Sequence, residues 1–337
     1  MSVLVTGVAG FIGNHLAHRL LEAGRSVVGL DNLSPYYDVT LKRARLERLQ
    51  SFENFTPLVL DLCDAQALGR AFGEHKPEAV LHMAAQPGVR YSLEAPEAYV
   101  QSNMVGFANL LEACRHHRPR HLIYASSSSV YGANTSLPSS THGPADHPLT
   151  LYAASKRANE LMAHSYSHLF AIPATGLRFF TVYGEWGRPD MAFFKFTDAI
   201  LNDRPIQVYN EGRMSRDFTY VKDVAEAVVR LIDHVPSPDA GWQPQAPDPA
   251  SSGVAPHRVY NVGNATPVAL MTYIELLQEA LGRRALIELA PMQQGEVKDT
   301  WADTRDLSEL IGYTPQTPVE TGIARFVVWY KDYYGIS

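Results

Sequence analysis

The 337-residue chain carries 29 basic and 35 acidic residues, for a net charge of −6, and 46% of its residues are hydrophobic against 19% charged. This composition is ordinary for a globular protein, and the length favours two domains or one large α/β unit with a cap. The charge balance argues against a nucleic-acid partner or an anionic membrane surface. It leaves room for an anionic small substrate, because a few placed arginines outweigh the global balance locally.

The cysteine content and the N-terminus favour a reducing compartment and no membrane-spanning segment. Cys63 and Cys114 are the two cysteines and no CxxC motif occurs, so we expect neither a disulfide framework nor a metal site, and a reducing cytoplasm fits. The short apolar run at the N-terminus has no basic leader before it, and no apolar segment reaches 18 residues. We therefore expect no membrane-spanning segment.

The first 32 residues have the pattern of a strand, a glycine turn, a helix and a second strand. The strand Ser2–Thr6 precedes the turn Gly7–Gly13, and helical spacing over His15–Ala23 precedes the strand Ser26–Leu30. A glycine turn here lets a pyrophosphate approach the backbone at a helix N-terminus, and Asp31 can accept hydrogen bonds from ribose hydroxyls. A GxxGxxG triplet alone can be an ordinary turn, but this placement favours dinucleotide binding. A carboxylate would repel a 2′-phosphate, which favours NAD over NADP.

Strands and helices continue to alternate as far as about residue 170. Repeated βα units predict a Rossmann-type, doubly wound parallel sheet, with ligands at the C-terminal ends of the strands. The expected strands are Thr56–Leu60, Ala79–Met83 and His121–Ala125, and the expected helices are Ala65–Gly73 and Ala98–His116.

The residues expected to hold NAD lie in the glycine turn or just after these strands. Asp61 and Leu62 are expected at the adenine edge, and the small residues after the next strand let the cofactor lie across it. The predicted set is Gly7, Gly10, Phe11, Ile12, Gly13, Asp31, Asn32, Asp61, Leu62, Met83, Ala84 and Ala85.

Beyond about residue 170 the rhythm of the elements becomes irregular. We expect residues 1–175 to form the NAD-binding Rossmann domain with the catalytic residues. Residues 176–337 are expected to form mainly a smaller mixed α/β substrate-binding domain, with elements interleaved back to the Rossmann sheet. Residues 236–256 contain six prolines, which predicts a flexible loop. The expected later elements are strands Thr175–Phe180 and Val259–Val262 and helices Phe193–Asn202, Lys222–His234, Val268–Gly282 and Thr317–Tyr334.

A candidate proton-transfer group follows the strand His121–Ala125. The serines Ser126–Ser129 come directly after it, and Tyr152 and Lys156 are four residues apart, so they share one face of a helix. A phenol with a pKa near 10 is a poor base at neutral pH, but an ammonium and an oxidised nicotinamide both favour the phenolate. Lys156 can also hydrogen-bond the nicotinamide ribose, and Ser127 can hold the substrate oxygen. Tyr-x-x-x-Lys alone occurs by chance on many helices; the upstream turn and serines favour catalysis.

Taken together, these motifs resemble the extended short-chain dehydrogenase/reductase family of nucleotide-sugar epimerases and dehydratases. The resemblance spans nearly the whole chain in order. It rests on Thr6–Gly13, Asp31-Asn32, Asp61-Leu62, His82–Ala85, Ser126–Ser128, Val130–Gly132, Tyr152–Lys156, Arg178–Thr181 and Arg216–Val221.

The resemblance implies roles for four positions and two partners. Ser127, Tyr152 and Lys156 would form the catalytic triad, with Tyr152 and Lys156 also contacting NAD, and Asn103 would join the cofactor side by shaping the active-site helix. The implied partners are a UDP-sugar substrate and a second copy of the chain. A homodimer is expected because Ala98–His116 and Leu151–Phe170 resemble the helix pair that forms a four-helix interface in this family.

Two positions separate the dehydratases from the epimerases. The dehydratases of the family carry an Asp-Glu pair where this chain has Ser128 and Ser129, so loss of water is disfavoured. The run Thr181–Ala192 is similar to the uronate 4-epimerase branch, which acts on UDP-glucuronate and UDP-galacturonate. The inserted proline-rich loop also fits that branch.

A substrate with a diphosphate and a carboxylate needs cationic contacts, and bidentate guanidinium groups suit both. Arg216, with Arg213 near it, is the candidate for the diphosphate, Arg188 with Thr181 for the carboxylate, and Arg90 is a further candidate; each arginine could instead be a solvated surface charge. The predicted substrate-binding set is Ser127, Ser128, Ser129, Tyr152, Thr181, Arg188, Arg216 and Arg90.

The function expected from the resemblance is NAD-dependent 4-epimerisation of UDP-glucuronate to UDP-galacturonate through a 4-keto intermediate and transient NADH. Three alternatives stay open. They are a UDP-glucose/UDP-galactose 4-epimerase, a decarboxylating UDP-glucuronate enzyme, and a non-catalytic NAD-sensing protein.

Overall fold

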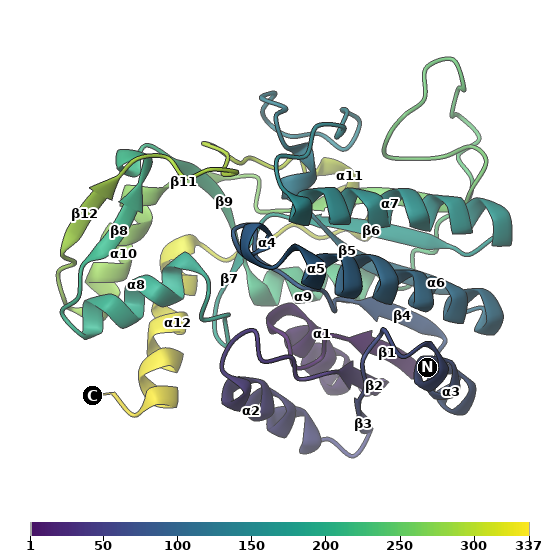
Figure 1. The fold of residues 1–337 in the computed structure, drawn as a ribbon, viewed down its shortest axis with the longest axis horizontal. Helices are drawn as coiled ribbons and strands as arrows, with labels where there is room; N and C mark the ends of the chain where they lie inside the picture. Colours follow the sequence, from purple (N-terminus) through teal and green to yellow (C-terminus); the bar gives the residue numbers. More distant parts are fainter. Residues whose placement is uncertain (1, 337) are drawn as a thin grey trace.

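A seven-stranded parallel sheet forms the centre of the computed structural model, which describes residues 2–336 (Figure 1). The strand order is β10-β6-β5-β4-β1-β2-β3, so the chain winds outward in both directions from the β1–β4 pair. The predicted Rossmann-type doubly wound sheet is confirmed. The strands are β1 Ser2–Thr6, β2 Ser26–Asp31, β3 Phe55–Val59, β4 Ala79–His82, β5 His121–Ser127, β6 Ala174–Phe179 and β10 His257–Val262.

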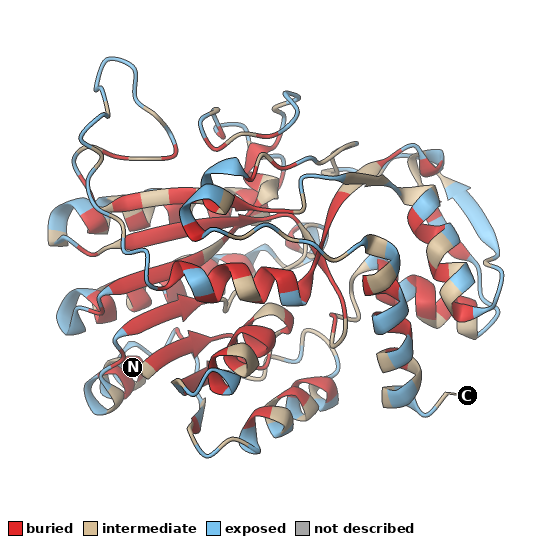
Figure 2. Ribbon diagram, turned by 180° about the vertical axis from the view of Figure 1, so that it is seen from behind, coloured by how far each residue is buried: buried red, intermediate tan, exposed pale blue. Residues whose placement is uncertain are grey.

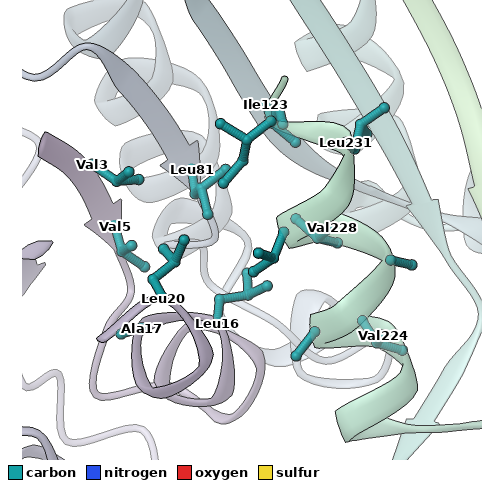
Figure 3. Close-up of a cluster of buried hydrophobic side chains, with 14 of the residues drawn as sticks. Val3, Val5, Leu16, Ala17, Leu20, Leu81, Ile123, Val224, Val228 and Leu231 are labelled. Carbon is teal, nitrogen blue, oxygen red and sulfur yellow. The ribbon is translucent and has the colours of Figure 1, made fainter. Parts of the chain in front are cut away.

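Helices cover both faces of this sheet, which explains its nearly continuous apolar strands. On one face, Val3, Val5 and Leu81 pack against Leu16 of α1 and Val228 of α9 (Figure 3). The alternate strand residues face the other side and pack with α3, α6 and α7. Figure 2 shows the central strands as the most completely buried part of the chain. These helices are α1 Phe11–Glu22, α3 Ala65–His75, α6 Gly106–His117, α7 Leu151–Phe170 and α9 Val221–Leu231, with α2 Val39–Gln50 and α11 Arg305–Ile311 at the periphery.

A smaller region with its own aromatic core adjoins the carboxyl ends of the central strands (Figure 1). It starts where β7 follows β6 with one residue between them. Its two small sheets have the orders β11-β9-β7 and β12-β8. Its elements are β7 Thr181–Tyr183, α8 Ala192–Leu201, β8 Ile206–Tyr209, η3 Asn210–Gly212, β9 Ser215–Tyr220, β11 Pro267–Ala269, α10 Leu270–Leu281, β12 Ile287–Ala290 and α12 Val319–Tyr334.

The expected domain division between residues 175 and 176 falls inside β6. β10 returns to the central sheet from the later part of the chain, as the interleaving predicted. How function divides between the two parts stays a prediction. Residues 236–256 form a long excursion above α7 in Figure 1, and their flexibility likewise stays a prediction. Within residues 2–336, no helix combines the length and apolar character that crossing a membrane requires.

Two predicted helices are wrong in part. The expected continuous helix Ala98–His116 is instead α5 Pro96–Tyr99, a π-helical turn η1 Val100–Val105, and α6; a separate short helix, α4 Tyr91–Glu94, precedes them. Asn103 lies in the π turn and bonds across to other segments, which the widened turn permits. The helix expected from Val268 begins at Leu270, because Val268 pairs with Arg216 as a strand residue.

Candidate active site

One cavity runs from the glycine turn along the carboxyl ends of the central strands to the loop after β7. Most of the residues predicted for the site line it, whereas Asn103, Arg90 and Arg216 do not. The predicted residues that line it are Gly7, Gly10, Phe11, Ile12, Gly13, Asp31, Asn32, Asp61, Leu62, Met83, Ala84, Ala85, Ser127, Ser128, Ser129, Tyr152, Lys156, Thr181 and Arg188.

The glycine turn is packed too closely for side chains. A Cβ on Gly13, inside α1, would lie 2.2 Å from the carbonyl oxygen of Gly7, and one on Gly7, which has a φ of +72°, would lie 2.7 Å from the amide nitrogen of Ala84. The N-cap residue Gly10 has no side chain to accept hydrogen bonds from the first amides of α1. Those amides therefore remain for an anionic ligand, which fits the pyrophosphate of NAD.

The acidic residues beside the turn are held by hydrogen bonds from backbone and side-chain amides. The Asp31 carboxylate accepts hydrogen bonds from the amides of Ala9 at 3.0 Å and Leu33 at 2.8 Å. Asn32 donates to Asp61 at 2.8 Å, which links the ends of β2 and β3. Each carboxylate oxygen can accept more than one hydrogen bond, so Asp31 can still receive ribose hydroxyls.

Asn103 contacts the cavity wall from behind. Its side-chain oxygen accepts the Gln86 amide at 2.7 Å, and its nitrogen donates to the Gln86 carbonyl at 3.1 Å and the Ser155 hydroxyl at 3.0 Å. Asn159 donates to its backbone carbonyl at 2.6 Å. Asn103 thus joins the loop after β4 to α7, and direct contact with the cofactor stays a prediction.

The serines divide into two groups. Ser127 caps the 3₁₀ turn η2 Ser128–Tyr131 and lies 3.2 Å from the Ser129 hydroxyl, facing the cavity. Ser126 also borders the cavity, but its hydroxyl donates to the buried carboxylate of Glu160 at 2.6 Å. Arg178 binds both oxygens of Glu160, at 2.9 Å each. This buried ion pair anchors the end of β5 between α7 and β6, and no sequence motif indicates the role of Glu160.

Tyr152 and Lys156 lie on the first two turns of α7. Thr150 starts this helix, since its hydroxyl accepts the Ala153 amide at 3.2 Å. Lys156 donates to the Ala125 carbonyl at 2.9 Å, and burial lowers its pKa to about 8. Burial raises the pKa of Tyr152, while the Ser127 hydroxyl and the charge of Arg188 lower it.

Arg188 faces the cavity but is already paired. Its guanidinium makes a fork with Asp190, at 2.9 and 2.8 Å, and Tyr36 donates to the same carboxylate at 3.2 Å. Burial opposes the charge of Arg188, but Asp190 raises its pKa, so the group is a fixed cation. Neither Tyr36 nor Asp190 was predicted; the spacing Arg-Pro-Asp was the available indication.

The two remaining arginines meet on one carboxylate outside the cavity. Arg90 binds Glu296, with Nε 3.0 Å from Oε1, and Nη2 of Arg216 lies 3.7 Å from Oε2. Arg216 also donates to the carbonyls of Ser215 at 2.9 Å and Lys298 at 2.8 Å. A substrate role for these two arginines stays a prediction. Among residues 2–336, no three His, Cys, Asp or Glu side chains are grouped to hold a metal ion.

A dinucleotide turn and a Ser-Tyr-Lys group that open into one cavity define an α/β enzyme of hydride and proton transfer. The model of the NAD dependent epimerase/dehydratase family matches residues 3–263. The chain belongs to this family, which confirms the resemblance found in the motifs. It also confirms the prediction that the cofactor is NAD.

Individual relatives match over the whole chain. A probable UDP-glucuronate 4-epimerase of Rhizobium meliloti is 52% identical, with 99% of this chain and 98% of the relative covered. UDP-glucuronate 4-epimerase 1 of Arabidopsis thaliana is 43% identical, covering 100% and 78% respectively. The crystal structure of the Bacillus cereus UDP-glucuronic acid 4-epimerase with UDP-glucuronic acid and NAD superposes with a TM-score of 0.87 at 32% identity, covering 99% and 100%.

Proposed function

We propose that this protein catalyses the NAD-dependent 4-epimerisation of UDP-glucuronate and UDP-galacturonate. The observation that carries the proposal is that Ser127, Tyr152, Lys156 and Arg188 line the same cavity as the glycine turn. The first three supply proton transfer, and Arg188 supplies a fixed cation at the substrate end. The similarity to the Rhizobium, Arabidopsis and Bacillus enzymes supports the uronate substrate.

Proton transfer would start at the O4 hydroxyl of the sugar. Tyr152 as phenolate takes this proton, directly or through Ser127, and returns it at the end of the cycle. Bound NAD would supply a reversible acceptor for the C4 hydride, and the glycine turn with Tyr152 and Lys156 would hold it beside the sugar. Burial raises the pKa of Tyr152 in the protein alone, so positive charge has to offset it. Arg188 supplies part of this positive charge, and Lys156 and the oxidised cofactor are the expected further sources.

The carboxylate makes the 4-keto sugar a β-keto acid, which loses CO₂ readily. We assign Thr181 and Arg188, which both line the cavity, to hold the carboxylate. Held in this way, the C–C bond to the carboxylate stays out of line with the π system of the ketone. The fork with Asp190 fixes the guanidinium plane and leaves Nη1 for the substrate. Thr181→Ala and Arg188→Ala should therefore raise the fraction of UDP-4-keto-pentose in the products. An unchanged fraction in both variants would contradict this role.

Arg216 is proposed to bind the diphosphate, as the sequence suggested, and we propose the same role for Arg90 because it shares the Glu296 carboxylate with Arg216. Both contact Glu296 in the loop between β12 and α11. For the diphosphate to bind there, Glu296 has to give up at least one of them. The carboxylate then competes with the substrate for the same cations.

The experiment that tests the proposed function compares two substrate pairs. Purified protein is incubated with UDP-glucuronate and, separately, with UDP-glucose, and the products are identified by NMR. We expect UDP-galacturonate from the first and at least a hundredfold lower turnover of the second. Preferred turnover of UDP-glucose would identify a UDP-glucose/UDP-galactose epimerase. Stoichiometric release of CO₂ from UDP-glucuronate would identify a decarboxylase. No turnover of either, with NAD bound, would leave the NAD-sensing alternative.

We further propose that the protein forms a homodimer. We also propose that it works in a reducing compartment. The helices α6 and α7 lie side by side, and α7 exposes Leu161 at 57% and Leu169 at 64% of their surface. Such a surface suits a four-helix interface between two copies. Both cysteines are unpaired, which suits a reducing cytoplasm. Sedimentation analysis should give twice the chain mass, and Leu161→Glu should shift it toward one chain mass.

A further inference from the structure

Arg45, on α2, is a fully buried charged residue that belongs to none of the motifs, at 0% exposed. Its partners are all neutral, and within residues 2–336 no carboxylate forms an ion pair with it. A buried guanidinium without a counter-ion is costly unless several hydrogen bonds satisfy it. Five hydrogen bonds satisfy Arg45, and the charge of Asp31 favours its protonated form from a greater distance.

The hydrogen bonds of Arg45 reach three separate segments around the cavity. Nη1 donates to the carbonyl of Ala9 in the glycine turn at 2.9 Å and to the Tyr37 hydroxyl, in the loop after β2, at 2.6 Å. Nη2 donates to the carbonyls of Trp186 at 2.6 Å and Gly187 at 2.9 Å. Nε adds a second contact to Trp186 at 3.1 Å. One side chain thus ties the cofactor turn to the two residues before Arg188.

The same loop is held from two neighbouring positions. His15 of α1 lies 2.9 Å from the carbonyl of Glu185, and burial lowers the pKa of His15 to about 3, so the ring is neutral and donates through Nε2. The guanidinium of Arg48 lies 4.8 Å from the centre of the Trp186 ring. Trp186 itself has a φ of +61°, an unfavourable backbone conformation for a bulky residue. The contacts from α1 and α2 hold it there.

We infer that Arg45 is a positioning residue that fixes residues 185–188 against the cofactor turn and thereby sets the place of Arg188 in the cavity. This inference rests on the proposed function for its effect on the substrate. Arg188 is covalently next to Gly187, so a loss of the Gly187 and Trp186 bonds frees the backbone that carries it. Loss of these bonds should therefore weaken binding of the sugar carboxylate. Binding of the uridine diphosphate, which other residues hold, should not change.

Lysine cannot replace arginine in this role. It keeps the positive charge but offers a single nitrogen, whereas the guanidinium donates from three nitrogens in a fixed plane. Arg45→Lys therefore separates the geometry of the contacts from the charge. Arg43 lies on the exposed face of the same helix, so Arg43→Lys is the matched control.

The test has one readout that needs no substrate. Trp186 is a chymotrypsin site, and cleavage after it is followed by mass spectrometry on the folded protein with its bound NAD. We expect cleavage at least tenfold faster in Arg45→Lys than in the native protein and in Arg43→Lys. Equal cleavage rates would overturn the positioning role, whatever the substrate proves to be.

The second readout concerns the carboxylate. Arg45→Lys should raise the KM for UDP-glucuronate about tenfold and increase the UDP-4-keto-pentose fraction, with the Kd for UDP within twofold of the native value. Equal losses for UDP-glucuronate and UDP would overturn the link to Arg188. If Arg45→Lys is cleaved faster but the native protein does not turn over UDP-glucuronate, the proposed function is rejected. The role of Arg45 in holding residues 185–188 would then still stand. Should Arg45→Lys fail to fold, Tyr37→Phe removes one of the five hydrogen bonds and should show the same changes on a smaller scale.

Discussion

The ammonium nitrogen of Lys156 lies 2.9 Å from the carbonyl oxygen of Ala125, two residues before the catalytic serine candidate on the same strand. This contact holds α7 against the end of β5, so Tyr152 and Ser127 share one part of the cavity. It also buries an ammonium group, at 2% exposed, with no carboxylate bonded to it among the described residues. A charge buried in this way is available to stabilise an anion formed in the cavity.

The first prediction concerns the phenol. Tyr152→Phe removes the group proposed to take the O4 proton and should lower kcat by roughly 10²- to 10⁴-fold. The content of bound NAD and the Kd for UDP should stay within twofold, because the ring remains. Activity is measured by NMR of the uronate products. A variant that retains native turnover would remove Tyr152 from the mechanism.

The second prediction follows from the pKa of Lys156, which burial lowers from its ordinary 10.5 to about 8. Between these two values the unfolded chain binds the proton more often, so the cost of burying the charge is present below pH 8 and disappears toward pH 10.5. Lys156→Met removes this cost, on the order of 3 kcal/mol. The stability of Lys156→Met relative to the native protein should therefore be highest below pH 8 and fall as the pH rises.

Urea unfolding at pH 7 and at pH 10 measures this difference. The exposed Lys195, on α8, supplies the control Lys195→Met, whose relative stability should be the same at both values. A pH-independent difference for Lys156→Met would mean that the ammonium is solvated rather than buried.

The third prediction concerns the glycine turn. A Cβ at Gly13 would lie 2.2 Å from the Gly7 carbonyl oxygen, so Gly13→Ala forces the turn to move. The variant should retain less than a tenth of the NAD that co-purifies with the native protein, measured by chromatography after denaturation. Gly69 of α3 has open space around it, and Gly69→Ala should keep its NAD and gain up to ~1 kcal/mol from helix propensity. Full NAD content in Gly13→Ala would contradict the turn's role.

The sequence reveals those parts of the fold that local patterns encode. Strands buried on both faces appear as apolar runs, and the glycine turn and Tyr152–Lys156 are contiguous, so their positions could be predicted. Helix α2 could not be, because two of its buried residues, Lys42 and Arg45, are charged and hide its apolar face. The π turn around Asn103 was missed for a related reason, since bonds to residues 17 and 52 positions away specify it.

The same reasoning separates the predicted site residues from the missed ones. Arg188 was identified from its motif, but Tyr36, which donates to the Asp190 carboxylate paired with Arg188, is 154 residues from Asp190 in the chain. Glu296 is 206 residues from Arg90, and a lone acidic residue in a loop carries no pattern. Contacts of this kind depend on the assembled fold.

The fourth prediction concerns Glu296 and the two arginines that it binds. If Arg90 and Arg216 are diphosphate ligands, Glu296→Gln removes a competing charge, and the Kd for UDP should fall about threefold to tenfold. Calorimetry at low salt measures the change, which should shrink at high salt. Glu226 also binds two arginines, Arg19 at 2.9 Å and Arg230 at 2.7 Å, away from the cavity, and Glu226→Gln should leave the Kd unchanged. Equal affinities for all three proteins would place the diphosphate elsewhere.

In the proposed reaction the hydrogen at C4 leaves and returns within one binding event. UDP-glucuronate deuterated at C4 is incubated with the purified protein in ordinary water, and the UDP-galacturonate formed is examined by proton NMR and mass spectrometry. We expect the product to keep its deuterium at C4. A product that carries a solvent proton at C4, or the absence of UDP-galacturonate, would contradict it.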